Sequence, residues 1–572
     1  MKRRKKSFYF KDYTESKVPE QNFHLNIIKI SFNRIAFLSF VFLIILVICS
    51  IKIFYLSLSS DKNFYSKSIK ENFLNNRRDI VDRNGNILAT NVNLYDVGIR
   101  PTLLADKEKK NLLIKLSLLF PDLDIESIKK KLNKNNFFWL GRRLTPQEKD
   151  QLWLIGNKSF EFNSRSSRIY PQQNLFSHIL GQTDDINNGI SGFEKSFDKV
   201  LRNNKKINKP LYLTLDSNLQ YLIREELIKS QKDFQSIGSA ALLMNVNNGE
   251  ILSLISLPDY DLNKRVSLKS ESYINKITLG VYELGSVFKT FTIAAGLKSK
   301  MISSNTVFKD LEHSITCDKY TINEHDKLPK KLNTEEILVR SSNIGAVRIA
   351  QKLGVKKYKD FLNSLDLLDK INFDLDEVGT PLSFKWGKCK LATTSYGHGI
   401  TTTPLQLARA YAILGNGGYK IEPSILKKEK NYLEKREKII SDETSNKLNL
   451  MLRKVVSLDE GTANFANIKG YEVAGKTGTS MKYNSNEKLN TFVSIFPASR
   501  PKYVLLVMLD EPKPAPNYVY HFPPSDKYPN GYKYKGETRN TSGWNTVVVA
   551  GKIIEKIGPI LATNNLQAST NF

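Results

Sequence analysis

The sequence predicts a multidomain α+β protein that one N-terminal helix anchors in a membrane. Its 572 residues are enough for several domains, and the hydrophobic fraction of 41% supports a sizeable core. Residues 35–58 form one long apolar segment. Residues 60–205 mix short strands and helices, and from residue 211 onward strand-like apolar runs are interspersed with longer helical patterns.

The apolar segment at residues 35–58 is long enough to cross a bilayer. The preceding residues, 1–34, form a basic tail, and the positive-inside rule predicts that this tail stays in the cytoplasm while the rest lies outside. A cleaved signal peptide fits poorly, because the charged region is long and no A-x-A site follows. The alternative is a buried core helix.

The C-terminal part begins with a predicted strand at residues 211–215 and a helix at 218–231 that Asp216 or Ser217 caps. A hairpin follows, with strands at 240–246 and 251–255. The last predicted element is an amphipathic helix at 547–561. Residues 515–540 are rich in Pro, Tyr, Asn and Lys. This composition favours a solvated loop, although its position also allows contact with substrate or a partner.

The formal net charge of +29 is compatible with nucleic acid, an anionic surface or acidic substrates. Lysine is spread through most segments, so we expect no nucleic-acid binding. We also expect no metal and no cofactor, because the six histidines are scattered and neither C-x-x-C nor H-E-x-x-H occurs. Cys49 lies in the apolar segment. Whether Cys317 and Cys389 pair stays open.

Three short motifs occur in one order along the C-terminal two-thirds of the chain. They are Ser286-Val-Phe-Lys289, Ser341-Ser-Asn343 and Lys476-Thr-Gly-Thr479, that is, S-x-x-K, S-x-N and K-T-G. S-x-x-K also occurs elsewhere, but K-T-G occurs once. Together they form the motif set of penicillin-binding proteins and serine β-lactamases.

The context of each motif separates it from chance matches. The first motif opens a run at residues 287–297 that is typical of a buried helix. The second opens a helix at 344–353, with Gly354 as its predicted C-cap. The third precedes two predicted strands, 491–496 and 503–509.

The first motif supplies a nucleophile and a base. A serine hydroxyl is a weak nucleophile unless a base lies within hydrogen-bond reach, and residues three apart on a helix share a face. Lys289 can therefore take the proton of Ser286 once burial and nearby cations lower its pKa. Lys476 is the expected cation, and it can also bind a carboxylate. An isolated pair of this kind would be an ordinary N-cap and a solvent-facing lysine.

The other motif residues fit substrate binding. Ser341 can relay a proton and Asn343 can hold a substrate amide, although both can also be simple helix caps. Thr477 and Thr479 add hydroxyls, and an edge strand here could pair with an extended substrate. His398, in a glycine-rich stretch, is not expected to act as a base.

Beyond the motifs, the chain resembles a class B penicillin-binding protein, which is an inner-membrane peptidoglycan D,D-transpeptidase. The similarity runs from the anchor almost to the C-terminus. It is carried by the segments 77–89, 168–171, 192–194, 282–285, 403–406 and 416–418. The sequence departs from the family pattern at Arg78, where glycine is common, and at Leu284, where many members have proline. Glu283 and the segment 509–512 resemble the cell-division branch.

The resemblance implies the arrangement of the domains. We expect a cytoplasmic tail (1–34), a transmembrane anchor (35–58), an elongated α/β pedestal (60–205), a transpeptidase domain (206–562) and a C-terminal tail (563–572). The transpeptidase domain should contain an antiparallel sheet flanked by helices and an all-helical subdomain. Thr477, Gly478 and Thr479 should bind substrate, and the oxyanion hole should use the backbone N–H groups of Ser286 and Thr479.

The implied function is cross-linking of cell-wall stem peptides that end in D-Ala-D-Ala, through an acyl-serine, at the division septum. The implied partners are β-lactams, a glycan-polymerising glycosyltransferase and other divisome membrane proteins, at the bacterial inner membrane with the catalytic domain in the periplasm. Several alternatives remain open. They are an elongation-type transpeptidase, a carboxypeptidase, a serine β-lactamase, a membrane β-lactam sensor and a scaffold with an inactive site.

Overall fold

The structure, a computed structural model, describes residues 23–59 and 77–570, apart from 204–205, 265–266, 268–269, 319, 428–435, 484, 523 and 525–527. It divides into two compact units, Met1–Leu74 and Asn75–Phe572. The first 22 residues of the predicted tail lie outside the described residues.

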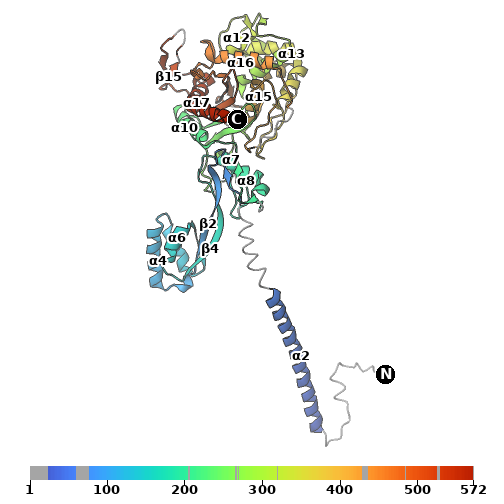
Figure 1. The fold of residues 1–572 in the computed structure, drawn as a ribbon, viewed down its shortest axis with the longest axis vertical. Coiled ribbons are helices and arrows are strands. Elements are labelled where there is room, and N and C mark those ends of the chain that lie inside the picture. The colour runs from blue at the N-terminus through green and yellow to red at the C-terminus, as the bar shows by residue number, and fades with distance from the viewer. Residues whose placement is uncertain are drawn as a thin grey trace, which may run out of the picture. The chain divides into compact units, whose positions relative to one another are not determined.

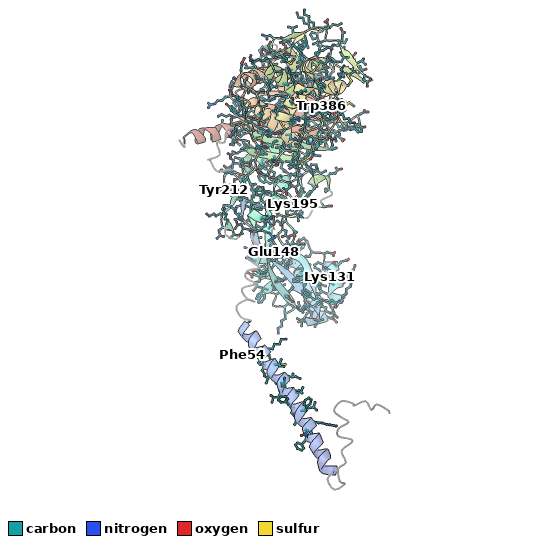
Figure 2. All side chains as sticks on the ribbon, turned by 90° about the vertical axis from the view of Figure 1, so that its right-hand side faces the viewer. Phe54, Lys131, Glu148, Lys195, Tyr212 and Trp386 are labelled. Atoms are coloured by element: carbon teal, nitrogen blue, oxygen red, sulfur yellow. A yellow bond between two sulfur atoms is a disulfide. The ribbon has the colours of Figure 1, made fainter. Side chains whose placement is uncertain are left out.

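The first unit contains helix α2 (Phe23–Ser59), which includes the predicted anchor (Figure 1). The span Phe32–Phe54 has a mean hydropathy of 2.8 and is 0% buried. Figure 2 shows the side chain of Phe54 projecting from this helix, and it is 67% exposed. Within the described part of the chain, α2 alone is long and apolar enough to cross a membrane.

The second unit begins with the pedestal, which is built around two long strands. β2 (Ile87–Ile99) pairs antiparallel with β4 (Phe160–Ile169) and with β3 (Phe138–Leu144). Figure 1 shows β2 and β4 side by side, with α4 (Asp106–Leu119) and α6 (Pro146–Trp153) near one end. These helices and α5 (Ile125–Asn133) close a small core with residues such as Val97, Leu116 and Leu144. Lys131 and Glu148 mark α5 and α6 in Figure 2.

The other end of β2 belongs to the main hydrophobic core, through Leu88 and Ala89. Here β1 (Ile80–Val81) pairs antiparallel with β2 and parallel with β5 (Leu211–Tyr212). The predicted strand at 211–215 is therefore shorter than expected. Leu213 forms only an isolated bridge, with Leu426, because the chain turns there to start α10 (Ser217–Asp233).

Three pedestal segments that carry the family resemblance meet in one buried ion cluster. The Glu194 carboxylate accepts a hydrogen bond from Arg77 Nε at 2.7 Å and another from Arg168 Nε at 2.7 Å. All three side chains are at most 1% exposed. Arg78, which stands where glycine is common, donates from Nε to the Lys209 carbonyl at 2.6 Å and so ties the start of the pedestal to the segment before β5.

The C-terminal part of the second unit is built on a five-stranded antiparallel sheet in the order β12-β13-β14-β6-β7. The predicted hairpin forms β6 (Gly238–Asn245) and β7 (Ile251–Leu257), and β12 (Ala474–Met481) is an edge strand, as predicted. The remaining strands are β13 (Lys488–Phe496) and β14 (Tyr503–Asp510).

Helices cover both faces of this sheet, and every residue of β14 is buried as a result. On one face, α10 (Ser217–Asp233) and α17 (Thr546–Thr570) pack together on the strands. On the other, α15 (Pro404–Gly415) packs on β6, β13 and β14. The α17 helix continues past residue 563, so the predicted tail is helical as far as Thr570.

The helical subdomain contains α11 (Lys289–Lys298), α12 (Thr334–Val339), α13 (Asn343–Ser364), α14 (Lys388–Thr394) and α16 (Asp442–Ser457). It also carries two short antiparallel pairs. β8 (Val307–Phe308) pairs with β11 (Leu332–Asn333), and β9 (Ser314–Cys317) pairs with β10 (Tyr320–Asn323). A disulfide joins Cys317 to Cys389, with Cα atoms 5.5 Å apart, which settles the pairing that the sequence left open.

The interpretation of residues 515–540 as a solvated loop is corrected by the structure. β15 (Val519–Phe522) and β16 (Tyr532–Lys535) form an antiparallel hairpin. Tyr520 is only 1% exposed, because its ring packs against Phe465 and Trp544. Although the composition of this segment is polar, the alternate aromatic residues Tyr520 and Phe522 of β15 pack against Phe465.

Candidate active site

The nucleophile motif begins in a tight turn that lies against the third motif. Gly285–Phe288 form a 3₁₀ turn, and α11 begins only at Lys289, so Ser286 precedes the α-helix instead of lying in its first turn. Gly285 has φ +64°, and a Cβ there would come within 2.6 Å of the Thr479 carbonyl oxygen. A Cβ on Gly478 would come within 2.2 Å of the Leu284 carbonyl oxygen. Two glycines thus allow the serine turn to lie directly against β12.

The three motifs meet at the hydroxyl of Ser341. Lys289 Nζ donates a hydrogen bond to this oxygen at 3.0 Å, and Lys476 Nζ donates to it at 2.9 Å. Lys289 Nζ also donates to the Ser341 backbone carbonyl. Both lysines are 0% exposed. Ser341 has φ +59°, a left-handed conformation that turns it toward both amines.

Burial of two amines in one site disfavours two positive charges. Loss of solvent lowers the pKa of Lys289 to about 7, and the carboxylate of Glu324 opposes this shift. The pKa of Lys476 is lowered well below its ordinary value, first by burial and then by repulsion from Lys289. The sequence predicted that Lys476 stays positive and lowers the pKa of Lys289. In the structure both amines are buried, and burial is the main cause that lowers the pKa of each.

The structure corrects the alternative that Ser341 and Asn343 are simple helix caps. Ser342, and neither Ser341 nor Asn343, caps α13, and its hydroxyl accepts a hydrogen bond from Gly345 N at 2.9 Å. Asn343 Nδ2 donates to the Asn323 carbonyl at 2.8 Å. Its Oδ1 is buried and has no partner within the described part of the chain, so this oxygen is an unused hydrogen-bond acceptor. The helix leaves helical geometry at Gly354, with φ +77° and ψ 163°, where the sequence predicted its end.

A cavity of about 710 Å³ lies beside these residues. Its lining includes Ser286, Ser341, Thr477 and Thr479 from the motifs. The Thr477 hydroxyl shares a hydrogen bond with the Thr462 hydroxyl at 2.9 Å, and the Thr479 hydroxyl accepts from Ser542 N at 3.0 Å. Both threonine hydroxyls of the third motif are thus held in place at the edge of the cavity.

Part of the cavity lining is aromatic. Phe465 lies 4.4 Å from Phe522 and 5.4 Å from Trp544, centroid to centroid. The guanidinium of Arg539 stacks 4.5 Å over the Trp544 ring. All four line the cavity, and Phe522 belongs to the β15–β16 hairpin.

His398 forms an ion pair and lies outside the lining of the cavity. Its Nδ1 is 3.2 Å from Glu283 Oε2, and the hydrogen bond to Glu283 raises the pKa of His398. A Cβ on the neighbouring Gly397 would come within 1.9 Å of the Gly285 carbonyl oxygen, so this glycine-rich stretch packs behind the serine turn.

Comparison with known proteins identifies the family. The penicillin-binding protein transpeptidase domain matches residues 239–521, and the penicillin-binding protein dimerisation domain matches residues 74–212. The probable peptidoglycan D,D-transpeptidase FtsI of Caulobacter vibrioides is 30% identical over 85% of this chain and 81% of its own length. The chain belongs to the penicillin-binding protein family.

Further similarities place this penicillin-binding protein in class B, as the motifs led us to expect. The peptidoglycan D,D-transpeptidase FtsI of Buchnera aphidicola subsp. Baizongia pistaciae is 30% identical over 84% of this chain and 91% of its own length. The crystal structure of apo penicillin-binding protein 3 from Mycobacterium tuberculosis has the same fold. Its TM-score is 0.63 at 20% identity, over 86% of this chain and 96% of that one.

The sequence did not point to several residues that shape the site of this penicillin-binding protein. Phe465, Phe522, Arg539 and Trp544 build the cavity wall from three separate segments. Glu324 follows a short strand in a stretch without strong periodicity, and its contact with the second motif depends on the disulfide-linked hairpin. The aromatic spacing of residues 518–522 was the one available signal for the hairpin.

Proposed function

We propose that this penicillin-binding protein cross-links peptidoglycan through an acyl intermediate on Ser286. The enzyme class expected from the motifs, a peptidoglycan D,D-transpeptidase of the cell-division type, is confirmed by the curated relatives and the transpeptidase domain. The observation that supports the residue assignments is the convergence of Lys289 and Lys476 on the Ser341 hydroxyl, beside the turn that carries Ser286.

In the proposed first step, Ser286 Oγ attacks the carbonyl carbon that joins the two D-Ala residues of a donor stem. The C–N bond to the terminal D-Ala breaks, and this residue leaves as the free amine. Backbone N–H groups of Ser286 and Thr479 stabilise the oxyanion. The close contact of Gly285 with the Thr479 backbone supports this pairing, because it brings the two segments together.

Lys289 is the proposed acceptor of the Ser286 proton. With a pKa of about 7, its amine is neutral in a large fraction of molecules at neutral pH, which a base must be. Ser341 accepts hydrogen bonds from both lysines, so its own proton points elsewhere. Because Ser341 lines the cavity, we propose that it passes a proton to the leaving amine.

Lys476, Thr477 and Thr479 are the proposed binding site for the terminal carboxylate of the donor. A carboxylate placed there raises the pKa of Lys476, so that Lys476 takes up a proton and becomes the cation of the pair. A positive Lys476 then opposes protonation of Lys289. Binding of the donor would in this way establish the charges that the sequence analysis assigned to the two amines.

In the second step, an amine of a neighbouring stem attacks the acyl carbon and gives up a proton to Ser341, a new amide bond forms, and Ser286 Oγ leaves with the proton returned by Lys289. We propose that Asn343 Oδ1 accepts a hydrogen bond from the donor amide, since it has no partner within the described residues. A β-lactam acylates Ser286 in the same way, but its ring nitrogen stays attached, which blocks the second step.

The family implies a peptidoglycan substrate and β-lactam binding, and helix α2 makes the chain a single-pass membrane-anchored protein. We propose further that the anchor lies in the bacterial inner membrane, with the basic tail in the cytoplasm and the second unit in the periplasm. We propose that a partner glycosyltransferase supplies the glycan strands and that other divisome membrane proteins are further partners.

An exchange assay tests the proposed reaction. The full-length protein is incubated with a peptide that ends in D-Ala-D-Ala and with an amine acceptor, and both D-Ala release and the new amide are measured. We expect both products from the wild type, neither from Ser286→Ala, and both from Ser127→Ala, which alters another S-x-x-K serine in the pedestal helix α5. Release of D-Ala without any new amide would contradict transpeptidation and support a carboxypeptidase.

A further inference from the structure

We propose that Glu324 is a positioning residue for acylation, because its buried carboxylate holds the turn that carries Ser341 and Asn343. The inference rests on the proposed function. It assigns a task in that reaction to a residue outside the three motifs.

The contacts of Glu324 are concentrated on the start of α13. Oε1 accepts hydrogen bonds from the Ser342 hydroxyl at 2.5 Å and from Ile344 N at 3.0 Å, and Oε2 accepts from Asn343 N at 2.7 Å. The residue is only 8% exposed. A carboxylate at a helix N-terminus satisfies amides that have no partner within the helix and also interacts favourably with the helix dipole.

These contacts fix the last two residues of the second motif. The Asn323 carbonyl, one residue before Glu324, accepts from Asn343 Nδ2 and so sets the amide orientation that leaves Oδ1 without a partner among the described residues. The Ser342 hydroxyl is held between Glu324 and Gly345 N. Ser341, at the preceding position, is in a left-handed conformation that non-glycine residues rarely adopt. Held at Ser342 and Asn343, the backbone is constrained to keep Ser341 between the two lysines.

The Glu324 carboxylate also influences the pKa of Lys289. Lys476 on β12, Glu324, and His325 after β10 are the titratable groups that face Lys289. Among them, Glu324 carries the negative charge and opposes the fall in the pKa of Lys289 that burial causes. Removal of this charge should therefore lower the pKa of Lys289 further. The acidic limb of the pH profile, where the acylation rate falls as Lys289 is protonated, should then move to lower pH.

The hairpin that presents Glu324 is itself fastened at two points. Glu324 N donates to the His313 carbonyl at 2.9 Å, across the β9–β10 pair. Cys317, on β9, is covalently joined to Cys389 of α14, and α14 packs on α13. The β9–β10 hairpin, which places the Glu324 carboxylate at the start of α13, is therefore covalently joined to a helix that packs on α13.

The test measures the rate of acylation by a fluorescent penicillin as a function of pH, together with the melting temperature, in Glu324→Gln, Glu324→Asp and Glu312→Gln. Glutamine has the same shape but places an N–H donor against a backbone donor, so we expect acylation at least about tenfold slower. Its acidic limb should lie at lower pH than that of the wild type. Aspartate keeps the charge, and we expect it to restore much of the rate and the wild-type limb.

Glu312→Gln is the matched control, because it makes the same substitution beside the hairpin in an exposed pair with Lys330. We expect it to behave as the wild type. If Glu324→Gln does not fold, Ser342→Ala, which removes one of the three contacts, should still slow acylation. The proposal would be overturned by a wild-type acylation rate in Glu324→Gln or Ser342→Ala. It would also be overturned if Glu324→Gln acylated more slowly, its acidic limb did not move, and Glu324→Asp did not restore the rate. Failure of the wild type to acylate would instead overturn the proposed function.

Discussion

Gly285 lies against Thr479 so closely that a Cβ on Gly285 would come within 2.6 Å of the Thr479 carbonyl oxygen. This contact joins the turn of the nucleophile to the edge strand that carries the third motif. It explains why Ser286 is preceded by glycine, since the same position also has φ +64°.

The first prediction concerns this contact. Gly285→Ala should slow acylation by a β-lactam at least about 100-fold, because a shift of about 1 Å in a reacting group can cost that much. Gly354→Ala is the control, since Gly354 also has a positive φ, +77°, but a Cβ there meets nothing within 4 Å. It should lose stability and keep its acylation rate. Equal rates in Gly285→Ala and the wild type would show that the contact does not position Ser286.

The second prediction concerns the pH dependence of acylation. Lys289 accepts a proton only when neutral, and it is protonated below its pKa of about 7. The rate should therefore be low in acid, rise through pH 7, and level off above it. Stopped-flow measurements with a fluorescent penicillin across this range provide the test. A rate that does not change between mildly acidic and mildly basic pH would rule out Lys289 as the base.

The third prediction separates the two lysines. Arginine keeps a positive charge but does not act as a base at neutral pH. Lys476→Arg should retain measurable acylation, because its proposed task is to hold a carboxylate, whereas Lys289→Arg should retain almost none. Thermal unfolding of both variants controls for loss of fold. If the two variants acylate equally fast, the proton must leave Ser286 by another route, for example through Ser341.

The fourth prediction concerns the disulfide. The double variant Cys317→Ser/Cys389→Ser should lower the free energy of unfolding by about 2–4 kcal/mol. It should also slow acylation, because the β9–β10 hairpin carries Glu324 to the second motif. Cys49→Ser, which removes the free thiol in helix α2, is the control and should change neither quantity. An unchanged acylation rate in the double variant would show that the hairpin stays in place without the covalent link.

Much of the fold could be predicted because its signals are local. The β6–β7 hairpin, the strands β13 and β14 and the end of the first part of α13 at Gly354 follow from apolar runs, turn residues and a glycine cap. The same applies to the anchor, where length and composition suffice.

Other features depend on contacts between distant segments, which local patterns do not encode. The buried cluster of Arg77, Arg168 and Glu194 joins three segments, and the resemblance supplied those segments without the ion pairs that connect them. The cap of α13 is shared between Ser342 and Glu324, and inspection of the motif alone does not reveal the part of Glu324. The burial of Tyr520 depends on rings contributed by Phe465 and Trp544.

The charges of the active site were the hardest to predict. The motif set places Lys289 and Lys476 in one site, but the pKa of Lys289 also depends on burial and on Glu324, which the sequence did not connect to them. The expected positive charge on Lys476 stays a prediction, which the two arginine variants test.

The central claim is that Ser286 becomes covalently acylated, and peptide mapping of the penicillin adduct tests it most directly. The full-length protein is labelled with a penicillin, digested, and analysed by mass spectrometry, with Ser286→Ala treated in parallel. We predict a single adduct on Ser286 and no adduct in the variant. An adduct on another serine, or undiminished labelling of a folded Ser286→Ala protein, would contradict the account.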